Sequence, residues 1–243
     1  MVRYLIIILA VALLGVSSQA VAQTDEDFSN ELSYGINFNS NGGLIGGIFV
    51  RSSYFKKERL YQFGAIEIVE VKHPKETRWY SVNTGDFFIY GKQNYLFVVR
   101  PQYGAEYILF RKAAESGVQV NAIGAIGPSL GLQVPYYIRY NYSQGGFEDV
   151  RTEQYNPVVH GDRNSIYGSA NVFTGLGEMA LRPGVHFKAG LTFEYGRYRE
   201  SVTGIEVGFL VEHYFKRPII IPDAQNVNTF PSVYLNIYYG TRK

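Results

Sequence analysis

The 243-residue sequence has no cysteine and almost balanced charge, with 23 Lys plus Arg against 21 Asp plus Glu. It therefore cannot draw stability from disulfides, and it lacks the positive excess that a nucleic-acid partner requires. A mixture of 21 Tyr, 16 Phe and 26 Gly suits membrane interfaces and curved sheets. Composition alone does not separate a membrane barrel from a soluble β-sandwich.

The amino-terminal residues have the pattern of a secretory signal peptide. Arg3 precedes an apolar run over residues 5–16, and small residues end at Ala22. The run is shorter than the ~20 apolar residues of a membrane-spanning helix. We predict a signal peptide over residues 1–22, a periplasmic lead-in over residues 23–30, and one barrel domain over residues 31–243.

Apolar and polar residues then alternate in eight segments, which is the pattern of β-strands with one apolar face. The first is the clearest, with Leu32, Tyr34 and Ile36 on one face and Ser33 and Asn37 on the other. The predicted strands cover residues 31–39, 44–54, 60–72, 94–110, a segment that begins at 118, 184–195, 202–213 and 233–239. The last strand should pair with the first and close the sheet.

The segments between the strands alternate in length. Short charged turns near residues 56, 112 and 196 fall on one side, and long loops at 73–93, 133–182 and 214–231 fall on the other. Outer-membrane barrels have short periplasmic turns, long external loops and an even number of strands. We therefore predict an all-β fold, an antiparallel transmembrane β-barrel of eight strands with long external loops, in the bacterial outer membrane after export.

Two alternatives to this architecture remain open. Ten strands would result if residues 130–142 and 165–175 formed an additional hairpin in the barrel. A soluble lipocalin-like barrel would reverse the faces, with the apolar residues around an internal ligand and the charged residues in water.

In a transmembrane barrel, the polar side chains that alternate along each strand would point into the lumen. The predicted lumen polar network consists of Arg51, Glu67, Arg100, Glu106, His186, Lys188, Glu194, Glu206 and Glu212. The predicted lipid-facing residues are Tyr34, Ile36, Phe97, Val99, Phe187, Leu191, Val207, Phe209, Leu235 and Ile237. An eight-stranded barrel is just wide enough to be filled by its own side chains. An ion-pair network that fills the lumen is the favoured interpretation, and a narrow channel is the alternative.

The sequence offers little for catalysis. A hydrolase at the barrel rim would need a nucleophile and a histidine, and His160 beside Asp162 or His213 beside Glu212 are the candidates. Neighbours in a strand point to opposite faces, so the second pair is poorly placed. We predict no catalytic, cofactor-binding or metal site, no cofactor and no enzyme activity, with a rim-active lipid or peptide hydrolase as an alternative.

Three carboxy-terminal segments carry a family resemblance: residues 182–196 (RPGVHFKAGLTFEYG), 202–209 (VTGIEVGF) and 234–240 (YLNIYYG). In these the chain resembles small outer-membrane β-barrel proteins of the Bacteroidota type. The resemblance implies the fold and the location and says little about activity. Because some relatives are accessories of the type IX secretion apparatus, a role as accessory of an outer-membrane secretion apparatus is a further alternative.

The predicted function is that of a non-enzymatic outer-membrane barrel, a structural, binding or assembly component that acts through its external loops. The predicted partners are outer-membrane lipid, the barrel-assembly machinery and a protein at the loops over residues 133–182. Tyr238 or Tyr239 could supply the aromatic residue near the carboxy terminus that assembly machinery reads.

Overall fold

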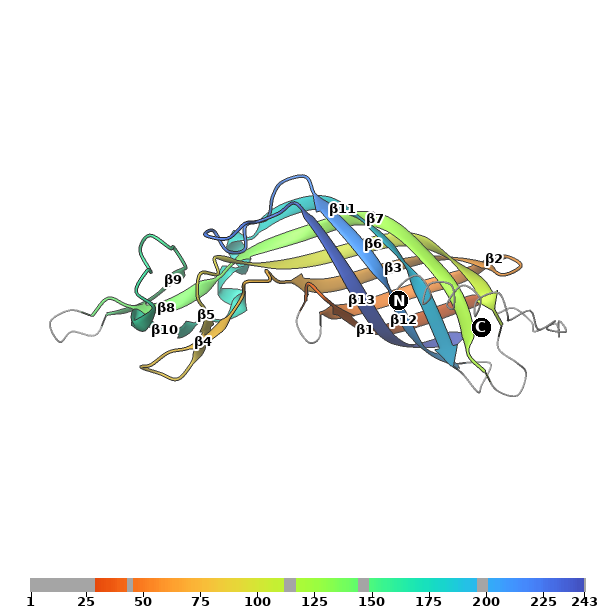
Figure 1. Ribbon diagram of the computed structural model, residues 1–243, viewed down its shortest axis with the longest axis horizontal. Helices are drawn as coiled ribbons and strands as arrows, with labels where there is room; N and C mark the ends of the chain where they lie inside the picture. The colour runs from red at the N-terminus through yellow and green to blue at the C-terminus, as the bar shows by residue number, and fades with distance from the viewer. Residues whose placement is uncertain (1–28, 43–45, 112–116, 144–148, 196–200, 243) are drawn as a thin grey trace, which may run out of the picture.

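The computed structural model describes residues 29–42, 46–111, 117–143, 149–195 and 201–242. It shows a closed antiparallel barrel of eight strands (Figure 1), which confirms the predicted fold. In order around the barrel the strands are β1 (Asn30–Asn39), β13 (Thr229–Arg242), β12 (Ser201–Tyr214), β11 (Ala180–Tyr195), β7 (Gln119–Pro135), β6 (Asn94–Phe110), β3 (Leu60–Val71) and β2 (Gly47–Lys57).

The first and last strands close the barrel, as predicted. Tyr34 lies opposite Tyr239, and Ile36 lies opposite Ile237. The ten-strand alternative correctly paired its two additional segments but wrongly placed them in the barrel. Its two segments do contribute strands that pair with each other, β8 (Tyr137–Asn141) and β10 (Ile166–Ser169), but these belong to a separate sheet outside the barrel.

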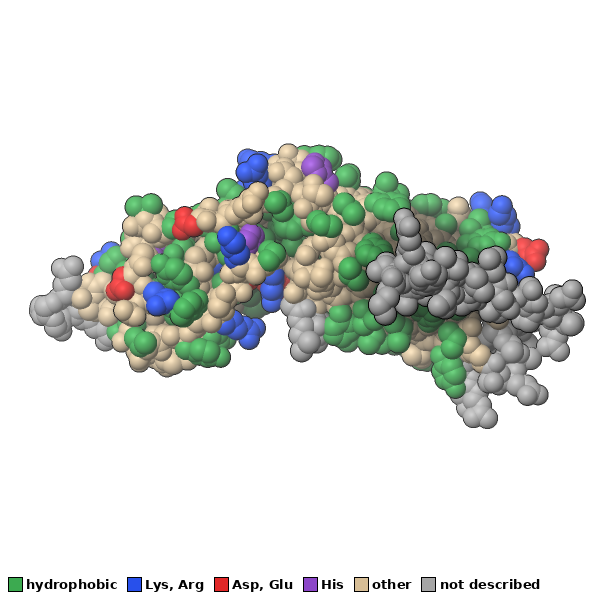
Figure 2. Space-filling model, in the orientation of Figure 1, with side chains coloured by type: hydrophobic (Ala, Val, Ile, Leu, Met, Phe, Trp, Pro, Cys, Tyr) green, Lys and Arg blue, Asp and Glu red, His purple; other side chains and the backbone are tan. Residues whose placement is uncertain are grey.

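The barrel strands bury their polar phase and expose their apolar phase. On β12, Ile205, Val207 and Phe209 are exposed, whereas Glu206 and Glu212 are fully buried. Figure 2 accordingly shows patches of hydrophobic side chains on the part of the barrel surface that is not drawn in grey. A protein in water normally keeps charges outside unless they are paired. The lipocalin-like alternative, which requires the charged phase outside, is therefore wrong.

The two segments expected as irregular loops contain further strands, and they fold together into what we call the lobe, the described residues of 73–93 and 136–179. It holds a hairpin of β4 (Arg78–Tyr80) and β5 (Phe87–Ile89), and a sheet in the order β10–β8–β9, where β9 is Val150–Gln154. These strands lie together at one end of the barrel (Figure 1). They enclose a core of Phe88, Tyr136, Ile138, Tyr140, Tyr155 and Ile166.

The ten-strand alternative included the segments of β8 and β10 but placed them in the barrel, and sequence patterning missed β4, β5 and β9. Each lobe strand is only three to five residues long, too short to establish a period of two. The lobe also contains two 3₁₀ helices, η1 (Arg163–Ser165) and η2 (Val172–Glu178).

The mouth of the barrel beside the lobe is closed by the segment between β12 and β13. Ile220 and Ile221 are buried there against Val69, Val71, Leu96, Val98, Tyr214 and Phe230. The carbonyl oxygen of Ile220 accepts hydrogen bonds from the backbone N–H groups of Gln93 (2.9 Å) and Asn94 (3.3 Å). An apolar plug therefore lies above the charged interior.

Within the described residues, no helix is both long enough and apolar enough to cross a membrane. The predicted signal peptide and most of the predicted lead-in lie outside the described residues, so those boundaries stay predictions.

Candidate functional site

The charged interior begins below the plug with Arg100. Its guanidinium donates two hydrogen bonds to the Glu212 carboxylate, Nε to Oε1 and Nη2 to Oε2, each 2.9 Å. A third bond, 3.1 Å, joins Nη1 to Glu67. Paired, planar geometry of this kind is the strongest arrangement that an arginine and a carboxylate can form.

A second group of charges lies in the middle of the barrel. Lys188 Nζ is 2.8 Å from Glu206 and 3.7 Å from Glu67, and so links this group to the Arg100 group. Arg51 pairs with Glu206 and lies 3.8 Å from Glu106.

Two glycines opposite each other on β11 and β12, Gly190 and Gly208, leave space beside this middle group. A Cβ atom at either position would come within 2.7 Å of the Tyr234 hydroxyl. Lys188 in turn lies 4.4 Å above the Tyr234 ring, a cation–π distance. The glycines therefore let a large aromatic residue pack beside the ion pairs.

The third group lies at the end of the barrel away from the lobe. Arg242 pairs with Glu31 (2.6 Å) and with Glu194. The Asn121 amide donates to Glu194 (3.1 Å) and to Glu106 (2.6 Å), which connects this group to Arg51. Sequence reasoning did not name Glu31 or Arg242, although both continue the inward phase of the two strands that close the barrel.

All nine residues of the predicted lumen network are buried inside the barrel, each less than a tenth exposed. Eight of them belong to one connected chain of ion pairs and hydrogen bonds from Arg100 to Arg242. The ninth, His186, contacts the hydroxyl of Ser129 (3.1 Å), which donates to Glu212 (2.6 Å). With Glu31 and Arg242 included, four cations face six carboxylates. Removing one partner of a buried ion pair in this network leaves the other charge unpaired, which destabilises the folded protein.

The ten predicted lipid-facing residues lie on the opposite phase of the strands. Seven are exposed: Tyr34, Ile36, Phe187, Leu191, Val207, Phe209 and Ile237. Phe97, Val99 and Leu235 are half-buried.

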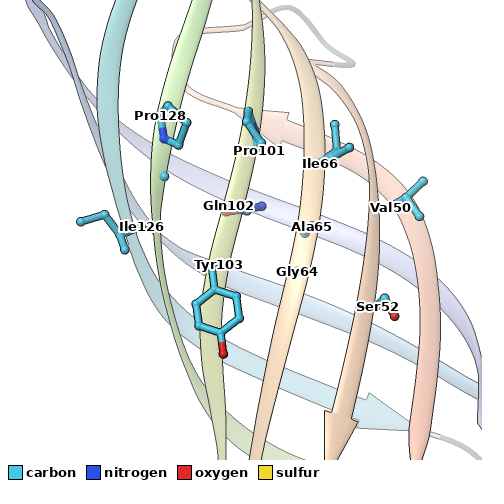
Figure 3. Close-up of a pocket in the computed structure, with 11 residues that line it drawn as sticks. Val50, Ser52, Gly64, Ala65, Ile66, Pro101, Gln102, Tyr103, Ile126 and Pro128 are labelled. Atoms are coloured by element: carbon cyan, nitrogen blue, oxygen red, sulfur yellow. The ribbon is translucent and has the colours of Figure 1, made fainter.

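A groove of about 570 Å³ runs along this outer wall across β2, β3, β6 and β7 (Figure 3). Its floor contains Ser52 and Gly64, which lie side by side between the larger Leu32 and Tyr103. The β6–β7 pairing is also interrupted where Pro101 and Pro128 occur, since proline cannot donate to the ladder. The exposed side chains that line the groove are mainly apolar, which fits a lipid chain better than a polar substrate.

The histidines proposed for a rim hydrolase make other contacts. His160 is buried and lies 3.1 Å from both Glu153 and the Tyr142 hydroxyl, while its Nδ1 accepts from the Asn156 N–H (2.9 Å). Asp162, its predicted partner, instead caps η1.

His213 contacts the Thr229 hydroxyl (2.8 Å) on the outside, while its neighbour Glu212 points inside to Arg100. Ser129 and His186 touch in the sealed interior, but the serine hydroxyl is bonded to Glu212 rather than aimed at a substrate. None of these three hydroxyl–histidine contacts has the relay from carboxylate to imidazole to hydroxyl that activates a nucleophile; at His160 the carboxylate and the hydroxyl both contact the same nitrogen, Nε2. In the described part of the chain, no group of three or more His, Cys, Asp or Glu residues could hold a metal ion.

The junction of the lobe and the barrel contains a buried lysine that sequence reasoning missed. Lys92 Nζ bonds to Glu76 (2.9 Å), lies 3.9 Å from Glu70, and sits 4.4 Å above the Tyr95 ring. Burial lowers the pKa of Lys92, and the two carboxylates act in the opposite direction. These contacts fix the loop before β6 to the barrel rim.

The β4–β5 hairpin presents aromatic and aliphatic side chains to solvent. Trp79, Tyr80, Val82 and Phe87 are exposed, Tyr80 by 70% and Val82 by 77%. Two arginines lie on these rings: the Arg78 guanidinium is 5.4 Å from the Phe87 ring, and that of Arg163 is 4.0 Å from the Trp79 ring. Neither arginine has a carboxylate within salt-bridge distance among the described residues. We call these six residues the arginine–aromatic face.

No protein-family model and no curated protein sequence matches the chain. Among solved structures, the chain is similar to Ail, the attachment invasion locus protein of Yersinia pestis, in a structure with the heparin analogue sucrose octasulfate. The two sequences are 9% identical, the match covers 88% of this chain and 97% of that chain, and the TM-score is 0.39. The chain is also similar to Neisserial surface protein A, with 10% identity, 89% and 97% coverage, and a TM-score of 0.40.

Proposed function

We propose that this protein is a non-enzymatic barrel of the bacterial outer membrane that binds a partner outside the cell through its lobe. Export by the amino-terminal segment, contact with assembly machinery and a Bacteroidota origin are parts of the same proposal. For assembly, Tyr239 is the better candidate signal, because it is exposed on the wall whereas Tyr238 is buried in the lumen.

The placement in a membrane is supported by the reversed surface of the barrel. An apolar outer wall around a charged interior is stable only if the surroundings of the wall are apolar. The mature protein should therefore need detergent for extraction, and its folded barrel should migrate faster than the heated form in gel electrophoresis. Solubility without detergent would contradict the proposal.

The closed interior favours binding over transport. The ion-pair chain fills the barrel and the apolar plug covers one end, so we propose that the lumen does not conduct. Planar-bilayer recordings should show no steady conductance. A stable open level in the wild type that changes in Arg100→Ala would favour the channel alternative.

The arginine–aromatic face is the observation that carries the binding role. Trp, Tyr and Arg are the residues most enriched at the energetic centres of protein interfaces, and here they are exposed on a hairpin that is itself held rigidly. Arg139 of β8 pairs with Asp86, and the amide of Asn83 donates to the carbonyl of Asn164 in η1 (2.8 Å), so the hairpin is fixed to the neighbouring sheet and to η1. Within the described residues neither guanidinium has a carboxylate partner, which favours a binding partner that offers anionic groups beside apolar ones.

The binding role can be tested with the protein in lipid nanodiscs and an immobilised polysulfated glycan as the anionic probe. The wild type should bind, and added salt should weaken binding because exposed charges are screened. The double variant Arg78→Ala, Arg163→Ala should lose most of the binding. Arg151→Ala is the matched control, since Arg151 is an exposed arginine already paired with Asp149 (2.6 Å). Equal binding by wild type and double variant would overturn the assignment of this face.

A further inference from the structure

The helix η2 lies at the edge of the lobe that meets the barrel (Figure 1) and exposes an apolar ridge. A 3₁₀ helix has three residues per turn, so side chains three positions apart lie in line. Phe173 and Leu176 have this spacing, and Met179, which caps the helix, follows at the same interval. Phe173 is 70% exposed, Met179 52% and Leu176 41%. No described residue covers this ridge.

The opposite side of η2 is fixed to the rest of the molecule. Gly175 is buried, and a Cβ atom there would come within 2.5 Å of the carbonyl oxygen of Pro135, the last residue of β7. The Asn171 side chain caps the helix by accepting from the Phe173 N–H (3.0 Å), and Glu178 accepts from the Tyr137 hydroxyl (2.8 Å). The direction of the ridge is therefore set by packing.

The ridge continues the apolar outer wall of the barrel. Leu181, on β11, is two residues after Met179. Its side chain faces outward, and it lies opposite Leu132 of β7. Figure 1 shows η2, in teal, where the barrel meets the lobe. Met179 is only two residues from Leu181, so a medium that covers the wall at this end lies beside the ridge.

The length of β11 places the ridge at the boundary of a membrane. Leu181 precedes Tyr195 by fourteen residues, which is about 46 Å along a strand and about 35 Å along the normal at a tilt of about 40°. The apolar band of such barrels is about 25 Å tall and is flanked by aromatic residues. With Tyr195 at the headgroups of one interface, Leu181 lies at the depth of the opposite headgroups, and Met179 of the ridge is two residues before it.

From this placement we propose that η2 is an interfacial anchor whose ridge inserts into the lipid of the outer leaflet. Amphipathic segments of various lengths bind membranes with the apolar face at the boundary between headgroups and acyl chains. Such an anchor would hold the lobe at a fixed angle to the membrane. The inference rests on the proposed function, because it requires a barrel wall that faces lipid.

Tryptophan fluorescence in vesicles tests the anchor. The chain has one tryptophan, so Trp79→Phe, which keeps a ring beside Arg163, gives a silent background. Single tryptophans are then introduced as Phe173→Trp on the ridge, Phe209→Trp on the wall and Val158→Trp on a lobe tip that is 91% exposed. Each variant is refolded into phosphatidylcholine vesicles brominated at either a shallow or a deep acyl position, and folding is checked by heat-modifiable migration.

We expect the Phe209→Trp variant to lose fluorescence to bromine, the Phe173→Trp variant to be quenched more by shallow than by deep bromine, and the Val158→Trp variant to be unaffected. If the Phe173→Trp and Val158→Trp variants behave alike while the Phe209→Trp variant is quenched, the anchor is overturned and the membrane barrel stands. If the Phe209→Trp variant is not quenched in a folded protein, the proposed function fails together with the anchor. Leu176→Trp repeats the test one turn along the ridge.

Discussion

The barrel interior and the lobe core are two buried regions of one chain built from opposite residue types. The interior holds ion pairs such as Arg100 with Glu212 and Lys188 with Glu206. The lobe core holds Phe88, Ile138 and Ile166 among tyrosines. The barrel thus buries the polar phase of its strands, and the lobe buries the apolar phase.

The difference shows that alternation along a strand does not by itself determine which face is buried. The medium outside each region, lipid or water, determines which face is buried. A wall in lipid must be apolar, so polar residues move inside and must pair with one another. A lobe in water gains by burying apolar surface. The two regions therefore depend on different forces and should respond to different substitutions.

Two independent readouts can follow the two regions. Heat-modifiable migration reports the closed barrel, while Trp79, the one tryptophan of the chain, lies in the lobe hairpin and reports the lobe by its fluorescence.

The largest effect is expected from Glu206→Gln, which leaves Arg51 and Lys188 in the interior with one carboxylate fewer. Removal of one partner from a buried ion pair typically costs about 3–5 kcal/mol. The free energy of unfolding, measured by the urea dependence of heat-modifiable migration, should fall by this order. The double variant Arg51→Met, Glu206→Met should cost less than the sum of its two single variants, because both charges of the pair leave together. A loss below about 1 kcal/mol for Glu206→Gln would contradict a network held by paired charges.

Ile138→Ala should have a comparable or slightly smaller effect, confined to the lobe. Ile138 is fully buried in the lobe core, and truncation of such a residue costs about 2–5 kcal/mol. The melting temperature reported by Trp79 fluorescence should fall, with barrel migration unchanged. Val158→Ala, at an exposed tip, is the control and should change neither. A simultaneous loss of barrel migration would mean that the two regions do not unfold separately.

The lobe should also be sensitive to alkaline pH. Burial raises the pKa of Tyr136 to about 12, and its hydroxyl oxygen accepts from the Ile89 N–H (2.9 Å). Because the pKa is raised on folding, the stabilisation is fully present below the ordinary tyrosine value near 10 and is lost as pH rises toward 12. The loss amounts to about 1–3 kcal/mol over this window.

The change in Trp79 melting temperature between pH 9 and pH 11 should therefore be smaller in Tyr136→Phe than in the wild type. Both proteins are compared at the same pH, so that quenching by other ionised tyrosines affects both. An equal alkaline loss in the two proteins would assign the sensitivity to other groups.

The sequence predicted the barrel well because long strands repeat their signal. Over seventeen residues of β6, alternation is unmistakable, and the inward phase directly yields residues such as Arg100 and Glu106. Prediction weakened at strand ends, where Glu31 and Arg242 were not named although they have the correct phase.

The lobe and the plug could not be predicted in the same way. The pairing of β8 with β10 was foreseen only as a hairpin of the barrel, not as part of a separate sheet. Lys92 meets Glu76 only because a long loop folds back on the rim. Such contacts depend on tertiary packing rather than on a local period. The ridge of η2 is an intermediate case, since its three-residue spacing is visible in the sequence but has meaning only once the helix type is known.

The smallest effect is expected from Arg151→Ala, which sharpens the contrast between buried and exposed ion pairs. Arg151 bonds to Asp149 through two nitrogens, at 2.9 and 2.6 Å, a geometry close to that of Arg100 with Glu212. Hydrogen bonding to Arg151 lowers the pKa of Asp149, so any stabilisation is present above the ordinary aspartate value near 3.8 and is lost as pH falls below it.

Both side chains are open to solvent, however, and water and salt screen an exposed pair. Arg151→Ala should leave the Trp79 melting temperature unchanged at neutral pH. A fall in melting temperature as large as that of Ile138→Ala would show that the geometry of an ion pair matters more than its burial. The difference between the ion pairs of the interior and those of the lobe surface could then not be attributed to the surrounding medium.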